Sequence, residues 1–249
     1  MQYGICTLSI VPVRSQPDDA SEMVTQLLYG ENFKILDERG KWSRIRIAFD
    51  SYEGWISNSQ VSKIEEELYE KLVNHERIYS ADLIEFIGEE SGNLTHIPMG
   101  AVLNHAALLN HTFEGHTIAG LKPKSGLIDT AILYLNTPFL WGGKSPFGID
   151  SSGLTQMVYM LNGYSLQRDS AQQAKQGEAL SFIEESEPGD LAFFDDAEGN
   201  IIHVGLIMPD NYIIHADGKV RIDRIDHSGI FNMDLRKHTH KLRVIKKII

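Results

Sequence analysis

The chain has 249 residues, of which 42% are hydrophobic and 23% charged, and its formal net charge is −11. This length and composition predict a soluble globular protein with one large domain or two to three small ones. The charge leaves no basic surplus to neutralise phosphates, so we expect no nucleic-acid partner, and no apolar run is long enough to predict a membrane span. Cys6 is the only cysteine, which excludes an intrachain disulfide framework and a thiolate-rich metal site.

The N-terminal stretch predicts a small β-barrel, which we place at residues 1–62. Short apolar runs alternate here with turn residues, and Gly30, Gly40 and Gly54 fall where turns or bulges are needed. This spacing is typical of a five-stranded barrel. The expected strands cover residues 5–13, 23–28, 33–36, 42–47 and 54–56.

A second small unit is expected at residues 63–123. Residues 65–73 form a charged, helix-compatible connector, and short strands punctuated by glycines follow between Ile78 and Ala119. We interpret this unit as another small β-barrel-like domain. The linker that ends it is expected at residues 122–126.

Residues 124–249 change to an α+β pattern. Helices are expected at 127–135, 152–162 and 170–177, the last opened by a good capping position. Strands are expected at 190–194, 203–208, 212–215 and 220–225. A helix that carries a nucleophile and packs on an antiparallel sheet that carries histidines is a papain-like arrangement.

The segment from Trp141 to Gly153 has the layout of a glycine-rich loop that turns sharply into a helix. Residue 151 then lies in the first helical turn, where unpaired backbone N–H groups and the helix dipole stabilise negative charge. The pKa of a cysteine thiol would be lowered there, whereas the hydroxyl of Ser151 gains far less because its pKa starts many units higher. Asp150 beside it either helps to shape the site or only caps the helix.

Two histidines stand on neighbouring expected strands. His203 begins one strand, and His215 ends the next, twelve positions later. If a hairpin around residues 209–211 joins them, His203 would be the general base facing residue 151, and His215 would orient its ring. A zinc site is the rival interpretation, but no third ligand with short metal-type spacing accompanies the pair, so we expect no metal.

These residues also carry a family resemblance. The relevant segments are Trp141-Gly142-Gly143, Gly148 to Leu154, Pro188 to Leu191, His203-Val204-Gly205 and Ile214-His215-Ala216. In order and spacing they resemble the NlpC family of bacterial cell-wall cysteine peptidases, over about residue 126 to the C-terminus. The resemblance places the catalytic cysteine at Ser151, the base at His203 and the third, orienting polar group at His215.

The preceding barrels resemble the bacterial SH3 domains found before this peptidase domain in enzymes that trim murein peptides. Those enzymes are γ-D-glutamyl-L-diamino acid endopeptidases that prefer a free N-terminal L-Ala and need no cofactor. The resemblance therefore implies a murein peptide such as L-Ala-γ-D-Glu-diamino acid as the partner. It also implies a fold class of two small SH3-like β-barrels followed by an α+β papain-like peptidase domain.

The resemblance further implies residues that bind this substrate. Tyr52, Asp169 and Ser170 match the positions that receive the amine, and Trp141 and Ser152 belong to the motifs that line the site. A carboxylate, a hydroxyl and a phenol together can accept all three N–H donors of an ammonium group, and the carboxylate supplies the countercharge. The alternatives are helix capping for Asp169 and Ser170 and barrel packing for Tyr52.

Ser151 departs from the family pattern and has three explanations: a deliberate Cys-to-Ser change made to trap substrate, a natural inactive homologue, or a working serine variant. We favour the first, because the other motif residues are intact and drift usually erodes the partners too. The expected activity is thus that of a disabled peptidase, and a non-catalytic muropeptide-binding protein is the alternative.

We expect a monomer in the cytoplasm, or a periplasmic or exported protein if a leader has been removed.

Overall fold

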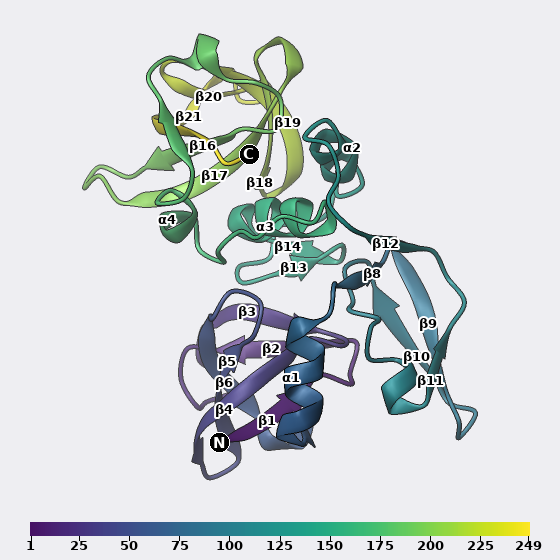
Figure 1. Cartoon of the computed structure of the whole chain (residues 1–249). Helices are drawn as coiled ribbons and strands as arrows, with labels where there is room; N and C mark the ends of the chain where they lie inside the picture. Colours follow the sequence, from purple (N-terminus) through teal and green to yellow (C-terminus); the bar gives the residue numbers. More distant parts are fainter. The chain divides into compact units, whose positions relative to one another are not determined.

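The computed structural model describes all 249 residues and divides them into two compact units (Figure 1). The first unit contains residues 1–120 and 141–146, and the second contains residues 121–140 and 147–249. The expected domain boundaries near residues 62 and 123 stay a prediction. The division assigns residues 141–146 to the first unit, although only residues 147–150 separate them from the helix that begins at Ser151.

The first unit begins with a seven-stranded antiparallel sheet. Its strands are β1 (Gln2–Ile5), β2 (Ile10–Arg14), β3 (Met23–Leu28), β4 (Asn32–Arg39), β5 (Trp42–Ile47), β6 (Glu53–Ser57) and β7 (Ser62–Ile64). They lie in the order β3-β2-β6-β5-β4-β1-β7. The expectation of five strands is wrong for two reasons. The first apolar run is broken after Ile5, where the backbone of Cys6 bonds to Gly30 and Glu31, and β7 pairs with β1.

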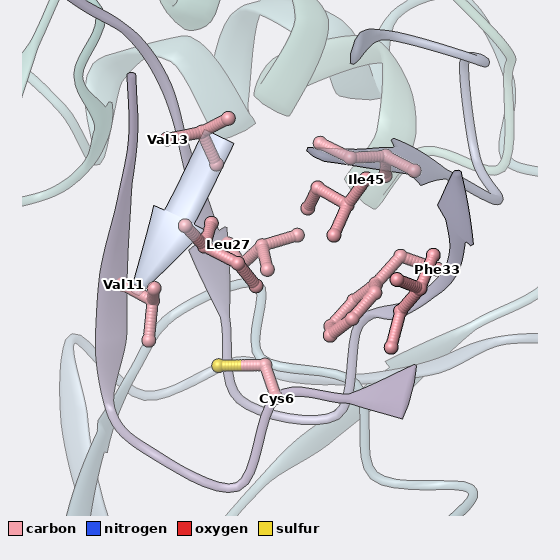
Figure 2. Packing of buried hydrophobic residues seen from close by; sticks show 9 residues of the cluster. Cys6, Val11, Val13, Leu27, Phe33 and Ile45 are labelled. Atoms are coloured by element: carbon pink, nitrogen blue, oxygen red, sulfur yellow. The ribbon is translucent and has the colours of Figure 1, made fainter. Parts of the chain in front are cut away.

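This sheet encloses one hydrophobic cluster (Figure 2). Alternate residues of β2, Val11 and Val13, point into it because successive side chains of a strand face opposite sides. Cys6 lies fully buried in the same cluster, and burial raises the pKa of its thiol to about 12. Cys6 is therefore a neutral core residue, as expected, and cannot serve as a nucleophile.

The rest of the first unit is a helix followed by two small sheets. The helical connector is confirmed as α1 (Glu66–Asn74). Strands β9 (Ile84–Glu89), β10 (Leu94–Pro98) and β11 (His111–Phe113) form one sheet, and β8 (Ile78–Ser80) pairs with β12 (Thr117–Ala119). Short 3₁₀ turns lie at η1 (Asn58–Gln60) and η2 (Ala107–Leu109). That this region is a second SH3-like domain stays a prediction.

The segment of residues 141–146 is held in the first unit by buried polar contacts. It contains β13 (Lys144–Ser145). The Lys144 ammonium donates to a carboxylate oxygen of Glu31 at 2.8 Å, and the Lys144 backbone N–H donates to the side-chain oxygen of Gln26 at 2.9 Å. Because both side chains of the ion pair are almost fully buried, each needs the other to satisfy its charge.

The second unit is built on a closed sheet. Its strands are β15 (Glu178–Leu180), β16 (Leu191–Asp195), β17 (Ile201–Met208), β18 (Tyr212–Asp217), β19 (Lys219–Asp226), β20 (Gly229–Asn232) and β21 (Lys237–Lys247), in the order β15-β21-β16-β17-β18-β19-β20. Strand β20 also pairs with β21, so β16 to β21 close into a barrel. The four expected strands are confirmed, whereas β15, β20 and the charge-rich β21 were missed.

Three helices accompany this sheet: α2 (Gly126–Ile132), α3 (Ser151–Leu161) and α4 (Ser170–Gln173). Every residue of α3 is buried, and the helix packs against β17, β18 and α2 (Figure 1). The expected helix at 170–177 is wrong beyond Gln173. Gly177 instead has a φ of +66° and lies so close to the carbonyl of Lys247 that a Cβ would clash.

The remaining short elements of the second unit are β14 (Gly148–Ile149), η3 (Ile183–Glu185) and η4 (Pro209–Asn211). The expected papain-like arrangement stays a prediction, although a helix beginning at residue 151 does pack on an antiparallel sheet. None of the helices has the length and apolar composition needed to span a bilayer.

Candidate active site

The start of α3 is fixed by a buried charged network around Asp150. The carboxylate of Asp150 caps the helix by accepting the backbone N–H of Gly153 at 2.6 Å, so the predicted capping role is confirmed. The two terminal nitrogens of Arg168, a residue that is only 1% exposed, donate to the two carboxylate oxygens at 3.0 and 2.8 Å. Ser152 completes the network, since its hydroxyl donates to Asp150 and accepts from Arg168. Sequence reasoning missed Arg168.

This network sets the surroundings of Ser151, the first residue of α3. Ser151 is buried, and it lies where the first-turn N–H groups and the helix dipole favour negative charge. The Arg168 guanidinium neutralises the cap carboxylate beside it. The position therefore suits an anionic nucleophile or an oxyanion.

The two predicted histidines are in direct contact. Strands β17 and β18 form the expected hairpin, with Gly205 opposite His215, so His203 lies two residues along on the same face. His203 Nε2 and His215 Nδ1 are 2.9 Å apart. Gly205 leaves space for this contact, because a Cβ there would come within 3.0 Å of the Cβ of His215 and 2.7 Å of Ile213.

His203 is a neutral imidazole in this environment. Burial lowers its pKa well below the ordinary range, and charge on His215 or His240 would lower it further. A neutral ring has one nitrogen lone pair available to accept a proton. His203 is thus in the protonation state that a general base requires near pH 7.

His240, on β21, is a third imidazole in this cluster and was not predicted. Its ring stacks on that of His203 at 4.2 Å between centroids and 26° between planes. The sequence offered no signal for it, because it lies 25 positions after His215 on a charge-rich strand that was itself missed. Burial also lowers the pKa of His240.

The three imidazoles of His203, His215 and His240 form a group that could hold a metal ion, with ligand nitrogens within 4.8 Å of one another. The sequence spacing gave no third ligand, and the structure supplies one. Stacked rings, however, direct their in-plane lone pairs side by side, whereas a tetrahedral ion needs lone pairs that converge on one point. A metal would therefore require rotation of at least one ring.

The contact between Ser151 and the imidazoles stays a prediction. Helix α3 packs against β17 and β18, which carry the two histidines, but no hydrogen bond joins the Ser151 hydroxyl to His203. A thiolate is attracted to a protonated imidazole by its negative charge, whereas a serine hydroxyl is neutral and has no such attraction. Nucleophile and base are also commonly further apart in the absence of substrate.

The predicted substrate-binding residues fall in both units. In the first unit, the Trp141 indole N–H donates to Glu22 at 2.6 Å, and Tyr52 packs against the barrel core. In the second, Asp169 precedes α4 and forms a capping box with Gln172, while Ser170 is the first residue of that helix. The capping role of Asp169 and the packing role of Tyr52 are thus confirmed, whereas the capping role of Ser170 and recognition of an amine stay predictions.

Comparison with known proteins finds family matches for two parts of this chain. Residues 136–239 match the NlpC/P60 family, and residues 13–61 match the bacterial dipeptidyl-peptidase SH3 domain. The chain carries an NlpC/P60 domain. It therefore combines a bacterial SH3 domain with an NlpC/P60 peptidase domain, as the sequence motifs indicated.

Similar proteins match the chain over most of its length and most of their own. Dipeptidyl-peptidase 6 of Lysinibacillus sphaericus is 27% identical, and the match covers 89% of this chain and 91% of that protein. The γ-D-glutamyl-L-lysine dipeptidyl-peptidase of Bacillus subtilis (strain 168) is 28% identical over 86% of this chain and 75% of its own. The crystal structure of an NlpC/P60 family protein from Bacillus cereus ATCC 10987 has the same fold, with a TM-score of 0.79 over 99% of both chains at 19% identity.

Proposed function

We propose that this NlpC/P60 chain has the scaffold of a peptidase that hydrolyses the bond between γ-D-Glu and the diamino acid of murein peptides with a free N-terminal L-Ala. The observation that carries the proposal is the contact between His203 and His215, 2.9 Å apart on the sheet against which α3 packs. The substrate class is supported by relatives named γ-D-glutamyl-L-lysine dipeptidyl-peptidase, which match the chain over most of its length.

In the proposed reaction, a nucleophile at position 151 transfers its proton to His203 and attacks the γ-glutamyl carbonyl carbon. The N–H groups at the start of α3 stabilise the oxyanion. The protonated His203 then gives its proton to the departing amine of the diamino acid, and water hydrolyses the acyl intermediate. A thiol performs the first step readily because its pKa lies near that of an imidazole, whereas a serine hydroxyl does not. We therefore propose that Ser151 leaves this chain inactive or nearly so.

The test is the variant Ser151→Cys with L-Ala-γ-D-Glu-L-Lys and its diaminopimelate counterpart as substrates. We expect release of the dipeptide L-Ala-γ-D-Glu, at a rate several orders of magnitude above that of the parent chain. The matched control is Ser151→Cys combined with His203→Asn, which keeps the thiol and removes the base. A folded Ser151→Cys protein that cleaves neither tripeptide would contradict the proposal.

A second candidate function is muropeptide binding without catalysis. Ser151 itself favours it, since an imidazole does not readily take the proton of a serine hydroxyl, as it would that of a cysteine thiol. Calorimetry with the unmodified chain and the free-amine tripeptide tests this candidate, and heat of binding is the expected result. Absence of measurable binding at millimolar peptide would eliminate it.

A further inference from the structure

The contact between the two histidines continues to a buried carboxylate. His215 uses Nδ1 toward His203, and its other ring nitrogen, Nε2, lies 3.1 Å from a carboxylate oxygen of Asp223 on β19. His215 and Asp223 are both fully buried. In the strand pairing, Ile213 lies opposite Asp223, so Asp223 and His215 share one face of the sheet.

Asp223 is held as an anion in one orientation. The Arg221 guanidinium donates to both of its carboxylate oxygens, at 2.5 and 3.0 Å, and the backbone N–H of Met233 donates to Oδ1 at 3.0 Å. Arg221 is fixed in turn by Asp234, at 2.8 Å. Burial opposes ionisation of Asp223, but the hydrogen bonds from His215 and Arg221 outweigh it and lower the pKa of the carboxyl.

An ionised carboxylate determines where the protons of the two imidazoles lie. Because it only accepts hydrogen bonds, His215 must donate to Asp223 from Nε2. When His215 carries this one proton, its lone pair is on Nδ1 and accepts from His203, so the proton of His203 lies on Nε2. The lone pair of His203 is left on Nδ1, the nitrogen that is not engaged with His215.

We propose that Asp223 is a positioning residue that fixes the tautomer of His215 and, through it, the tautomer of His203, so that His203 presents a basic Nδ1. Its effect on catalysis rests on the proposed peptidase function, whereas the tautomers themselves do not. Nothing in the sequence motifs marks Asp223, which lies eight positions after His215.

Nitrogen-15 NMR of the imidazole rings of the unmodified chain at neutral pH tests the tautomers without any activity. We expect both His203 and His215 to be protonated at Nε2. In Asp223→Asn we expect His215 to change to the Nδ1-protonated form. At the Oδ1 position an amide nitrogen would face two fixed donors, Arg221 Nη2 and the Met233 N–H. At the Oδ2 position it would face one, Arg221 Nε, together with His215, which can change from donor to acceptor, so the amide nitrogen is favoured there.

Asp226→Asn is the matched control, because Asp226 lies on the same strand and also pairs with a histidine, His238 at 2.9 Å, but is partly exposed. We expect it to leave the His203 and His215 signals unchanged. The proposal is overturned if His203 is protonated at Nδ1 in the unmodified chain, a result that needs no variant to fold. It is also overturned if a folded Asp223→Asn protein keeps the parent tautomers.

The consequence for catalysis is tested in the Ser151→Cys protein. We expect Asp223→Asn to lower kcat about 10²- to 10⁴-fold with little change in KM, because a histidine in the wrong tautomer cannot accept the proton. Asp226→Asn should retain the rate. An unchanged kcat for Asp223→Asn contradicts the positioning role. If Ser151→Cys is itself inert, the proposed function fails while the NMR result still decides the tautomers.

Discussion

At the scale of single residues, the candidate site depends on side chains that satisfy one another in places that water does not reach. Asp150 and Arg168 are both buried, and each would be costly alone because an unpaired buried charge loses its hydration without compensation.

Asp169 has two roles that differ in what they require. Its capping role needs only a side-chain oxygen, whereas recognition of an amine needs the negative charge of the carboxylate.

Removal of Arg168 should destabilise the second unit strongly. Arg168→Met leaves the Asp150 carboxylate buried without its bidentate partner, so we expect the free energy of unfolding to fall by about 3–5 kcal/mol, measured by urea denaturation. The control is Arg39→Met, which breaks an exposed ion pair with Asp37 and should cost less than about 1 kcal/mol. Equal effects of the two substitutions would argue against a buried structural pair.

The charge of Asp169 can be removed while the helix cap is kept, since asparagine is an equally good N-cap residue. In the Ser151→Cys protein, we expect Asp169→Asn to lower kcat/KM for the free-amine tripeptide about 10- to 100-fold through loss of a charged hydrogen bond. Turnover of an N-acetylated tripeptide, which has no ammonium group, should not change. An identical kcat/KM for the free-amine substrate would leave Asp169 with its capping role alone.

At the scale of secondary-structure elements, the pairing of β17 with β18 brings His203 to His215. Register decides this contact, because a shift of one residue would send the two side chains to opposite faces of the sheet. Gly205, opposite His215, provides the room. The glycine makes β17 less stable by itself, but because it has no side chain, the imidazole rings of His203 and His215 can meet.

A methyl group at Gly205 should therefore disturb the hairpin. In Gly205→Ala the new Cβ would lie within 2.8 Å of two atoms of Ile213, and we expect a loss of about 1–3 kcal/mol in unfolding free energy. Ile213→Val removes the nearer of those atoms, so the double variant should be more stable than the sum of the single changes predicts. A strictly additive double-mutant cycle by urea denaturation would show that this contact is not the cause.

At the scale of the whole molecule, both units bury histidines whose charged form is disfavoured. His203 is buried and His240 half-buried in the second unit, and His105 is buried in the first. Burial lowers the pKa of His105 to about 4, with further repulsion from Arg77. An unfolded chain would bind protons on these rings near pH 6.5, where the folded chain does not, so acid favours unfolding.

The sign of this effect can be tested at His105. The neutral His105 ring contributes fully to the free energy of unfolding above pH 6.5. This contribution, about 3 kcal/mol, is lost as the pH falls from 6.5 toward the folded-state pKa of about 4. Between pH 7 and pH 5, we expect His105→Gln to lose about 2 kcal/mol less unfolding free energy than the parent chain. The same change at the exposed His96 is the matched control. Parallel stability curves for the parent and His105→Gln would contradict a neutral buried ring.

The sequence by itself determined the local features of this protein. The capped start of α3, the hairpin of β17 and β18, and the order of the NlpC-type motifs all follow from patterns within a few residues, namely glycine turns, capping residues and alternation along a strand. Such patterns also identified Ser151 and the two histidines as the residues on which the chemistry depends. They misjudged the strand count of the first sheet, because neither the break in one apolar run nor the pairing of β7 with β1 leaves a local signal.

Only the tertiary structure decided which distant side chains complete the site. Arg168 reaches Asp150 across 18 positions, and His240 reaches His203 because β21 joins β16 to β20 and closes the barrel. Asp223 meets His215 through the register of β18 and β19. These partners are set by barrel closure and strand register, and both depend on how all the strands pack together, so no periodicity within one segment reveals them.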